Sequence, residues 1–191
     1  MRLSRMVTSP VLFFALLVGG QSPLQRAFAQ VQGDSGKQEP LTPGRQRKPA
    51  PNFILTDANG DTINLSTYKG KVVLLDFWAT WCGGCKTEIP WYIEFDARYK
   101  DRGLAVIGVS MDEDGWKTVK PFLALEKDPE TGGRTAMKYP VVIGSDSLAK
   151  QYHLKSMPMT LLIDREGRIA VSHSGMVDKD DWESKIRSLL Q

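Results

Sequence analysis

Short apolar segments recur along the chain and predict the strands of one sheet; they lie at 53–55, 62–64, 72–77, 104–109, 141–143, 160–163 and 169–172. The runs at 72–77 and 104–109 are almost uninterrupted, which is typical of central strands covered on both faces. Asn59-Gly60 separates the first two segments, and Asp164-Arg-Glu-Gly167 separates the last two. Both are turn sequences, so we expect a hairpin at each end of the domain.

Helical segments alternate with these strands and are predicted at about 85–99, 116–125, 146–153 and 178–190. Pro90 is expected to kink the first helix because it removes a backbone hydrogen bond. Asp146 is expected to cap the third helix, and Asp178 or Asp180 the last. Strands alternating with helices predict the α/β class, with a central mixed sheet covered by helices on both faces.

The first 29 residues have the pattern of an export signal. Arg2 and Arg5 precede an apolar run of eight residues at 11–18, and Ala27-Phe-Ala29 supplies the small residues that signal peptidase recognises. Crossing the hydrocarbon core needs about 20 apolar residues. We therefore expect residues 1–29 to be a signal peptide cleaved after Ala29, with an uncleaved, membrane-anchored form as the alternative.

Residues 30–50 contain almost no large apolar side chain, which predicts a flexible linker before a domain at 51–191. The predicted cleavage also changes the charge of the chain. The full sequence has 25 basic and 22 acidic residues, and residues 1–29 hold three of the basic ones and none of the acidic ones. The exported chain is therefore formally neutral, and its charge does not suggest a nucleic-acid partner.

Cys82 and Cys85 are the two cysteines of the chain. Export would place them where disulfides persist, but a loop this short adds little stability. The pair follows a buried strand and begins a helix, where unsatisfied amides favour the Cys82 thiolate. Cys82 is therefore the expected nucleophile, and Cys85 the resolving thiol. Gly83 and Gly84 would let the turn close and a partner chain approach.

Metal binding is the alternative use of two such cysteines. A zinc site needs four ligands, and His153 and His173 stand at no recognisable ligand spacing, so no metal or other cofactor is expected. A metallochaperone that holds copper with both thiols and one histidine remains the competing function from another class. Binding of one copper ion without disulfide reductase activity would favour it.

The segment Val73-Leu-Leu-Asp-Phe-Trp-Ala-Thr-Trp-Cys-Gly-Gly-Cys85 closely resembles the active-site segment of the thioredoxin superfamily. Further matches to its exported TlpA/ResA-like branch are Pro51-Asn-Phe53, Asp57-Ala-Asn-Gly60, Lys86-Thr-Glu-Ile-Pro90 and Met157-Pro158. The resemblance covers about residues 51–190. It implies a thioredoxin-like fold with an N-terminal hairpin and the activity of a thiol–disulfide oxidoreductase.

The resemblance also implies roles for single residues. Pro158 matches the family's cis-proline, which together with Met157 would present backbone to a substrate, and Trp81 would offer it an apolar contact. Glu88 matches an acidic residue near the cysteines, which could exchange a proton with the resolving thiol; the alternative is a surface charge. Asp76 matches the buried aspartate of cytoplasmic thioredoxins, and it interrupts an apolar strand where an unpaired charge is costly.

By resemblance, the protein would act as a monomer that reduces protein disulfides in the periplasm or its equivalent. A membrane-embedded protein would supply the electrons, and substrates could include apocytochrome c or copper-site proteins. A peroxidase of the related peroxiredoxin type is the second alternative. Such enzymes carry a Pro-x-x-x-Thr-x-x-Cys run, and this chain has none.

Overall fold

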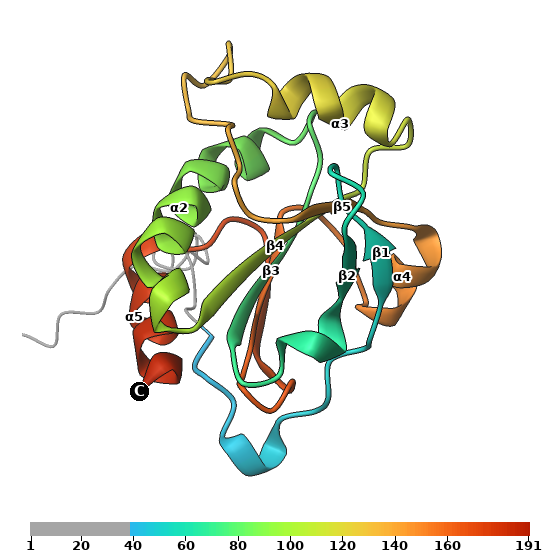
Figure 1. Ribbon diagram of the computed structural model, residues 1–191. Coiled ribbons are helices and arrows are strands. Elements are labelled where there is room, and N and C mark those ends of the chain that lie inside the picture. The colour runs from blue at the N-terminus through green and yellow to red at the C-terminus, as the bar shows by residue number, and fades with distance from the viewer. Residues whose placement is uncertain (1–38) are drawn as a thin grey trace, which may run out of the picture. The chain divides into compact units, whose positions relative to one another are not determined.

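The computed structural model describes residues 39–191 (Figure 1), so the predicted signal peptide lies outside the described residues. Its central sheet has the strand order β5-β4-β3-β6-β7. The strands are β3 (Val72–Trp78), β4 (Leu104–Ser110), β5 (Val141–Ile143), β6 (Met159–Ile163) and β7 (Ile169–Ser174). Strands β3, β4 and β5 are parallel, whereas β6 and β7 are antiparallel to their neighbours. The predicted mixed sheet is thus confirmed.

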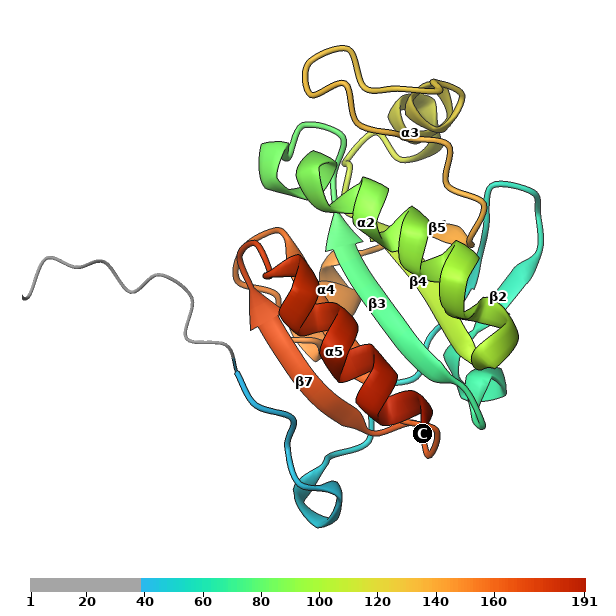
Figure 2. The same ribbon diagram turned by 90° about the vertical axis from the view of Figure 1, so that its left-hand side faces the viewer.

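Helices cover both faces of this sheet, as predicted. Figure 2 shows α2 (Gly83–Tyr99) and α5 (Lys179–Leu190) side by side on one face. The other face carries α4 (Asp146–Gln151) and the predicted antiparallel hairpin of β1 (Ile54–Thr56) and β2 (Thr62–Asn64). Helix α3 (Trp116–Leu123) and three short 3-10 helices, η1 (Gly44–Gln46), η2 (Leu65–Tyr68) and η3 (Lys100–Arg102), complete the domain.

Alternation along β3 divides the core in two. Leu74 and Trp78 pack into the cluster shared with α2 and α5, while Leu75 and Phe77 pack into the cluster shared with α4 and the hairpin. All seven residues of β3 are buried. Successive side chains of a strand point to opposite faces, so Asp76 lies on the same face as Leu74 and Trp78, beneath α2.

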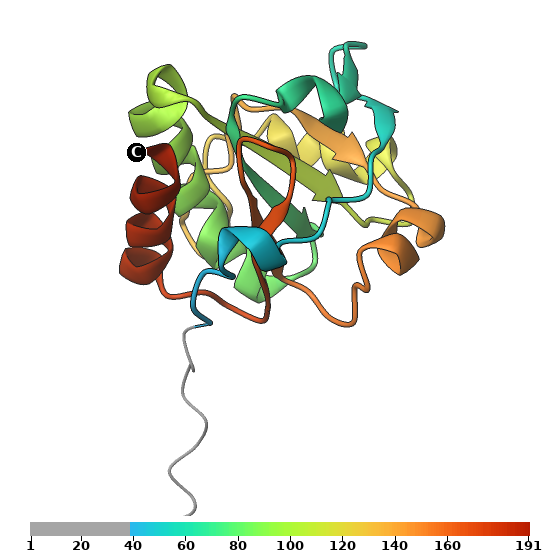
Figure 3. The same cartoon turned by 90° about the horizontal axis from the view of Figure 1, so that it is seen from below.

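The structure differs from the predicted flexible linker over residues 42–50. The Thr42 amide donates to the Ala170 carbonyl at 2.8 Å, and the Ile169 amide donates to the Lys48 carbonyl at 2.8 Å. Arg47 also forms an ion pair with the buried Asp164 at 3.1 Å. Figure 3 shows this segment running beside the β6–β7 hairpin. It covers the edge strand β7, whose backbone groups would otherwise lack partners. These hydrogen bonds join backbone groups, so the amino-acid composition of residues 42–50 did not predict them.

The helix caps agree with the sequence in part. Asp178 caps α5, since its side chain accepts a hydrogen bond from the Asp181 amide at 2.8 Å. Helix α4 is capped by Ser145, not by Asp146 as predicted, because the Ser145 hydroxyl accepts from the Leu148 amide at 3.2 Å. Ser145 has the extended backbone of a cap, and Asp146 is the first helical residue.

Within residues 39–191, no helix has the length and apolar character needed to cross a membrane.

Candidate active site around the Cys82–Cys85 disulfide

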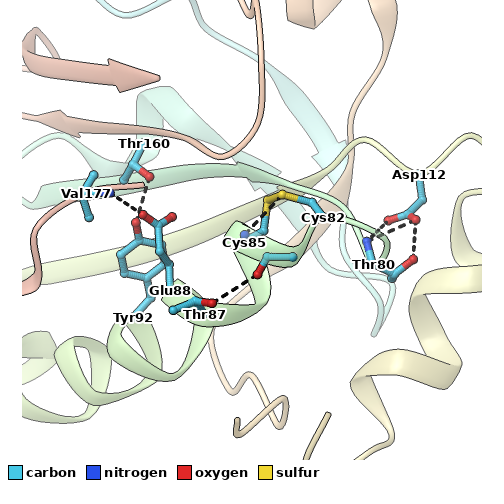
Figure 4. The surroundings of a disulfide bond; sticks show 10 residues. Thr80, Cys82, Cys85, Thr87, Glu88, Tyr92, Asp112, Thr160 and Val177 are labelled. Carbon is cyan, nitrogen blue, oxygen red and sulfur yellow. Dashed lines mark hydrogen bonds between the residues drawn. A yellow bond between two sulfur atoms is a disulfide. The ribbon is translucent and has the colours of Figure 1, made fainter. Parts of the chain in front are cut away.

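Cys82 and Cys85 form a disulfide at the N-terminus of α2 (Figure 4). Cys82 is the N-cap residue, and its sulfur accepts a hydrogen bond from the Cys85 amide at 3.2 Å. Its side chain is 7% exposed, whereas that of Cys85 is 1% exposed. Cys82 is therefore the more accessible sulfur and lies against the positive end of the helix, which stabilises a thiolate in the reduced protein.

The loop between β3 and α2 is held by Asp112, a residue that the sequence analysis missed. The backbone amide and the hydroxyl of Thr80 both donate to the Asp112 carboxylate, at 3.0 Å and 2.6 Å. The Ser110 hydroxyl donates to it at 2.8 Å. Asp112 follows β4 as the cysteine loop follows β3. The carboxyl ends of parallel strands meet at one edge of a sheet. The position of Asp112 just after β4 could therefore have predicted that it lies beside the cysteine loop.

Apolar groups surround the disulfide. Trp81, next to Cys82, is 68% exposed. Gly84, between the two cysteines, packs closely against Met176 and Pro158: an added Cβ would lie 3.1 Å from Cγ of Met176 and 3.2 Å from Cδ of Pro158. The Met157–Pro158 peptide bond is cis, as predicted. The predicted substrate-binding residues Gly84 and Pro158 are therefore brought together, and Met176, which is 51% exposed, joins them without having been predicted.

The remaining predicted contact residues flank this group. A Cβ added at Gly83 would meet nothing within 4 Å, so the helix start is open toward solvent there. Met157 is half-buried and packs against the core beneath α2 and α5. The site thus consists of one partly accessible sulfur beside an open helix start, with exposed thioether and indole side chains around it.

Glu88 is fully buried, so the alternative of a surface charge is wrong. One of its oxygens accepts a hydrogen bond from the Val177 amide at 2.6 Å, and the other has no partner among the described residues. Burial raises the pKa of Glu88 to about 7, although the Val177 amide and the Tyr92 hydroxyl lower it. Glu88 follows Cys85 by three positions along α2, which places both side chains on one face of the helix.

Asp76 lies on β3 beneath this part of α2. It is buried, and its cross-strand neighbour on β6 is Thr160, whose hydroxyl is 2.8 Å from that of Tyr92. Burial raises the pKa of Asp76 well above its usual range, and the charge of Glu88 raises it further. Figure 4 shows Glu88 and Tyr92 pointing from α2 toward Thr160 and Val177. Because the charge of Glu88 raises the pKa of the buried Asp76, the two carboxyl groups cannot both be ionised cheaply.

The two histidines are used elsewhere. His153 lies just beyond α4 with a φ of 55°, and His173 packs edge-on against Trp182. No group of three or more His, Cys, Asp or Glu side chains within residues 39–191 is arranged to hold a metal ion. Trp78 is fully buried and belongs to the core.

The comparisons with known proteins agree with this geometry. A model of the AhpC/TSA family matches residues 47–172. A thiol-disulfide oxidoreductase ResA of Geobacillus kaustophilus is 36% identical over 141 residues, which cover 73% of this chain and 75% of the relative. A ResA of Bacillus cereus is 32% identical over 163 residues, which cover 85% of this chain and 87% of the relative.

A solved structure from Chlorobium tepidum, titled as a thiol:disulfide interchange protein DsbE, has a TM-score of 0.66 and 32% identity and covers 76% of this chain and 97% of its own. The thioredoxin-like fold and the oxidoreductase activity implied by the sequence are thereby confirmed. The chain belongs to the AhpC/TSA family within the thioredoxin superfamily, and it is a thiol–disulfide oxidoreductase that carries a Cys82–Cys85 disulfide at the start of α2.

Proposed function

We propose that the protein reduces disulfides of other proteins in an extracytoplasmic compartment, with Cys82 as the attacking and Cys85 as the resolving thiol. The unequal burial of the two sulfurs carries this assignment, because only Cys82 combines access with a helix-terminal amide. The Cys82 thiolate attacks one sulfur of the substrate disulfide, and the other leaves as a thiolate. Cys85 then attacks Cys82, which closes the enzyme disulfide and releases the second substrate thiol.

The proton of Cys85 must leave before Cys85 can attack. Glu88 and Asp76 are the buried carboxyl groups on the same side of the sheet as the resolving thiol, and burial raises the pKa of both. The pKa of Glu88, about 7, suits proton transfer near neutral pH. In this assignment the two carboxyl groups take up the thiol proton as a pair. Each cycle moves two electrons from the dithiol to the substrate, and a dithiol donor must return them.

Two features of the site favour reduction over oxidation. The residues between the cysteines are glycines, so no histidine adds positive charge beside Cys82. Lys86 follows Cys85 directly, but its ammonium group is paired with Asp128 at 3.2 Å and Glu130 at 2.9 Å. A strong oxidant needs a much-stabilised thiolate. With little positive charge near the sulfurs, the thiolate is less stabilised, which lowers the reduction potential.

The export pattern of residues 1–29 supports the extracytoplasmic location. Soluble reductants are scarce outside the cytoplasm, so a membrane-embedded protein is the proposed electron donor. Cysteines of apocytochrome c or of copper-site proteins are the proposed substrates. A disulfide-bonded peptide with the Cys-x-x-Cys-His sequence of c-type haem attachment is a direct probe of the first class.

Cysteine variants test the assignment. Cys82→Ser should abolish insulin reduction, whereas Cys85→Ser should accumulate mixed disulfides with substrate. Faster alkylation of Cys85 than of Cys82 in the reduced protein at neutral pH would reverse the roles. Equilibration with glutathione tests the direction: we expect a potential nearer to thioredoxin, about −270 mV, than to DsbA, about −120 mV. A value above about −180 mV, the range of protein disulfide isomerase, contradicts the reductant assignment.

A further inference from the structure

Residues 175–178 join β7 to α5 and contact the turn between the two cysteines. A Cβ added at Gly84 would lie 3.1 Å from Cγ and 3.5 Å from Sδ of Met176. Met176 is nevertheless 51% exposed, so its side chain touches the cysteine turn on one side and solvent on the other. It is therefore part of the surface that a substrate meets beside the disulfide.

Two hydrogen bonds fix the backbone on either side of Met176. The Gly175 amide donates to the Pro158 carbonyl at 2.8 Å, and the Val177 amide donates to Oε1 of Glu88 at 2.6 Å. Gly175 has a φ of 99°, which glycine adopts without strain. The Val177 side chain is buried in the cluster beneath α2 and α5. Met176 is thus held between a backbone bond on one side and a side-chain bond from α2 on the other.

The bond from Glu88 ties residues 175–178 to the helix that carries both cysteines. Glu88 is fully buried one turn beyond Cys85, and Figure 4 shows its carboxyl group reaching from α2 to Val177. The bond itself is buried. A buried amide that loses its acceptor is costly, because no water replaces the lost partner. The segment therefore keeps its place against α2 only while position 88 offers an acceptor oxygen.

Exposed apolar side chains gather at this site. Among residues 39–191, four large apolar side chains are exposed, and two of them, Trp81 and Met176, lie beside the disulfide. Exposed apolar groups that lie together mark contact surfaces. A methionine side chain is flexible and polarizable, so it can pack against apolar groups of different shapes. These properties fit a polypeptide that carries an apolar side chain next to its disulfide cysteine.

We propose that Glu88 is a positioning residue of the substrate-binding surface: through the Val177 amide it holds Met176 against Gly84, and Met176 favours substrates with an apolar side chain beside the cysteine. The preference rests on the proposed function, since it concerns the disulfide that Cys82 attacks. The positioning role needs an acceptor oxygen at position 88 but no ionisable group. Glutamine supplies that oxygen without the acid, whereas aspartate keeps the acid but is shorter by one methylene group.

NMR of the oxidised full-length chain tests the positioning role without any turnover. Cross-relaxation between the γ-protons of Met176 and the α-protons of Gly84 should appear in the unmodified chain and in Glu88→Gln, and should be lost in Glu88→Asp. Glu94→Asp is the matched control and should keep the peaks, because Glu94 also lies on α2 but accepts from Lys179 at 2.6 Å. Absence of the peaks in the unmodified chain, their loss in Glu88→Gln or their persistence in Glu88→Asp would overturn the proposal.

The rate of mixed-disulfide formation tests the substrate preference. In the Cys85→Ser background the reaction stops after Cys82 has attacked and one peptide thiol has left. The probes are two disulfide-linked peptide dimers that carry leucine or serine beside the cysteine. The leucine peptide should react about fivefold faster with this chain and with its Glu88→Gln variant, the effect of partly burying one leucine.

Adding Met176→Ala or Glu88→Asp should reduce this ratio to less than about twofold, because the contact with the leucine is removed or displaced. Equal rates for the two peptides in the Cys85→Ser chain would overturn the preference. No reaction with either peptide would overturn the proposed function and with it the preference, whereas the NMR result decides the positioning role by itself.

Discussion

Replacing Glu88 by glutamine should stabilise the oxidised protein at neutral and alkaline pH. The carboxyl is fully buried and its pKa is about 7, against an ordinary value of 4.5. A carboxyl group with a raised folded-state pKa stabilises the fold fully only below its unfolded pKa. That stability is lost as the pH rises through the folded pKa. Glu88 therefore costs the native state free energy between pH 4.5 and about 7, and the full cost persists above that window.

The size of the effect follows from the pKa difference. One pKa unit corresponds to about 1.4 kcal/mol, so the shift amounts to about 3 kcal/mol. Glutamine has nearly the same shape, and its carbonyl oxygen can still accept from the Val177 amide, so the variant removes mainly the ionisation. The unfolding free energy of Glu88→Gln minus that of the unmodified chain should rise by about 3 kcal/mol between pH 4.5 and 8.

Urea unfolding of the oxidised protein at half-unit pH intervals measures this difference. The disulfide must stay closed, because free thiols would titrate in the same range. Glu113→Gln is the matched control, since that glutamate is exposed and its replacement should leave the pH profile parallel to that of the unmodified chain. Parallel profiles for Glu88→Gln and the unmodified chain would show that Glu88 is not a buried carboxyl with a raised pKa.

Three further substitutions test other parts of the site. Gly84→Ala should lower kcat/KM for insulin, because the added methyl group would press against Met176 and Pro158 at the predicted substrate-binding surface. Its unfolding free energy should change by less than about 1 kcal/mol. Adding Met176→Ala to this variant should restore part of the rate. Asp112→Ala should cost about 2 kcal/mol in urea unfolding, since it removes the acceptor of the buried Ser110 hydroxyl on β4 and of the half-buried Thr80 amide in the cysteine loop. Arg47→Ala should destabilise the domain by about 1 kcal/mol, whereas the exposed Arg45→Ala should not; equal values would show that residues 42–50 do not support the fold.

Much of this protein is determined by local sequence. The uninterrupted apolar runs of β3 and β4 predicted central strands, because a strand buried on both faces tolerates few polar residues. The Cys82–Cys85 pair at the start of a predicted helix indicated redox chemistry, since the helix terminus acts on the sulfur within one turn. Asn59-Gly60 predicted the first hairpin, because the backbone conformation of a turn depends on the residues of the turn itself.

Other properties were decided only by tertiary packing. The sequence alone did not decide whether Glu88 is a surface charge or a buried acid. Its burial, and with it the raised pKa, follows from packing against segments far away in the chain, among them the one that contains Val177. Residues 42–50 have the composition of a linker, yet they are ordered by backbone bonds to the edge strand β7. Gly108 carries no motif and becomes the neighbour of Asp76 only through the register of β3 and β4. Burial and pKa depend on groups distant in sequence, so they follow from the assembled fold and not from any local pattern.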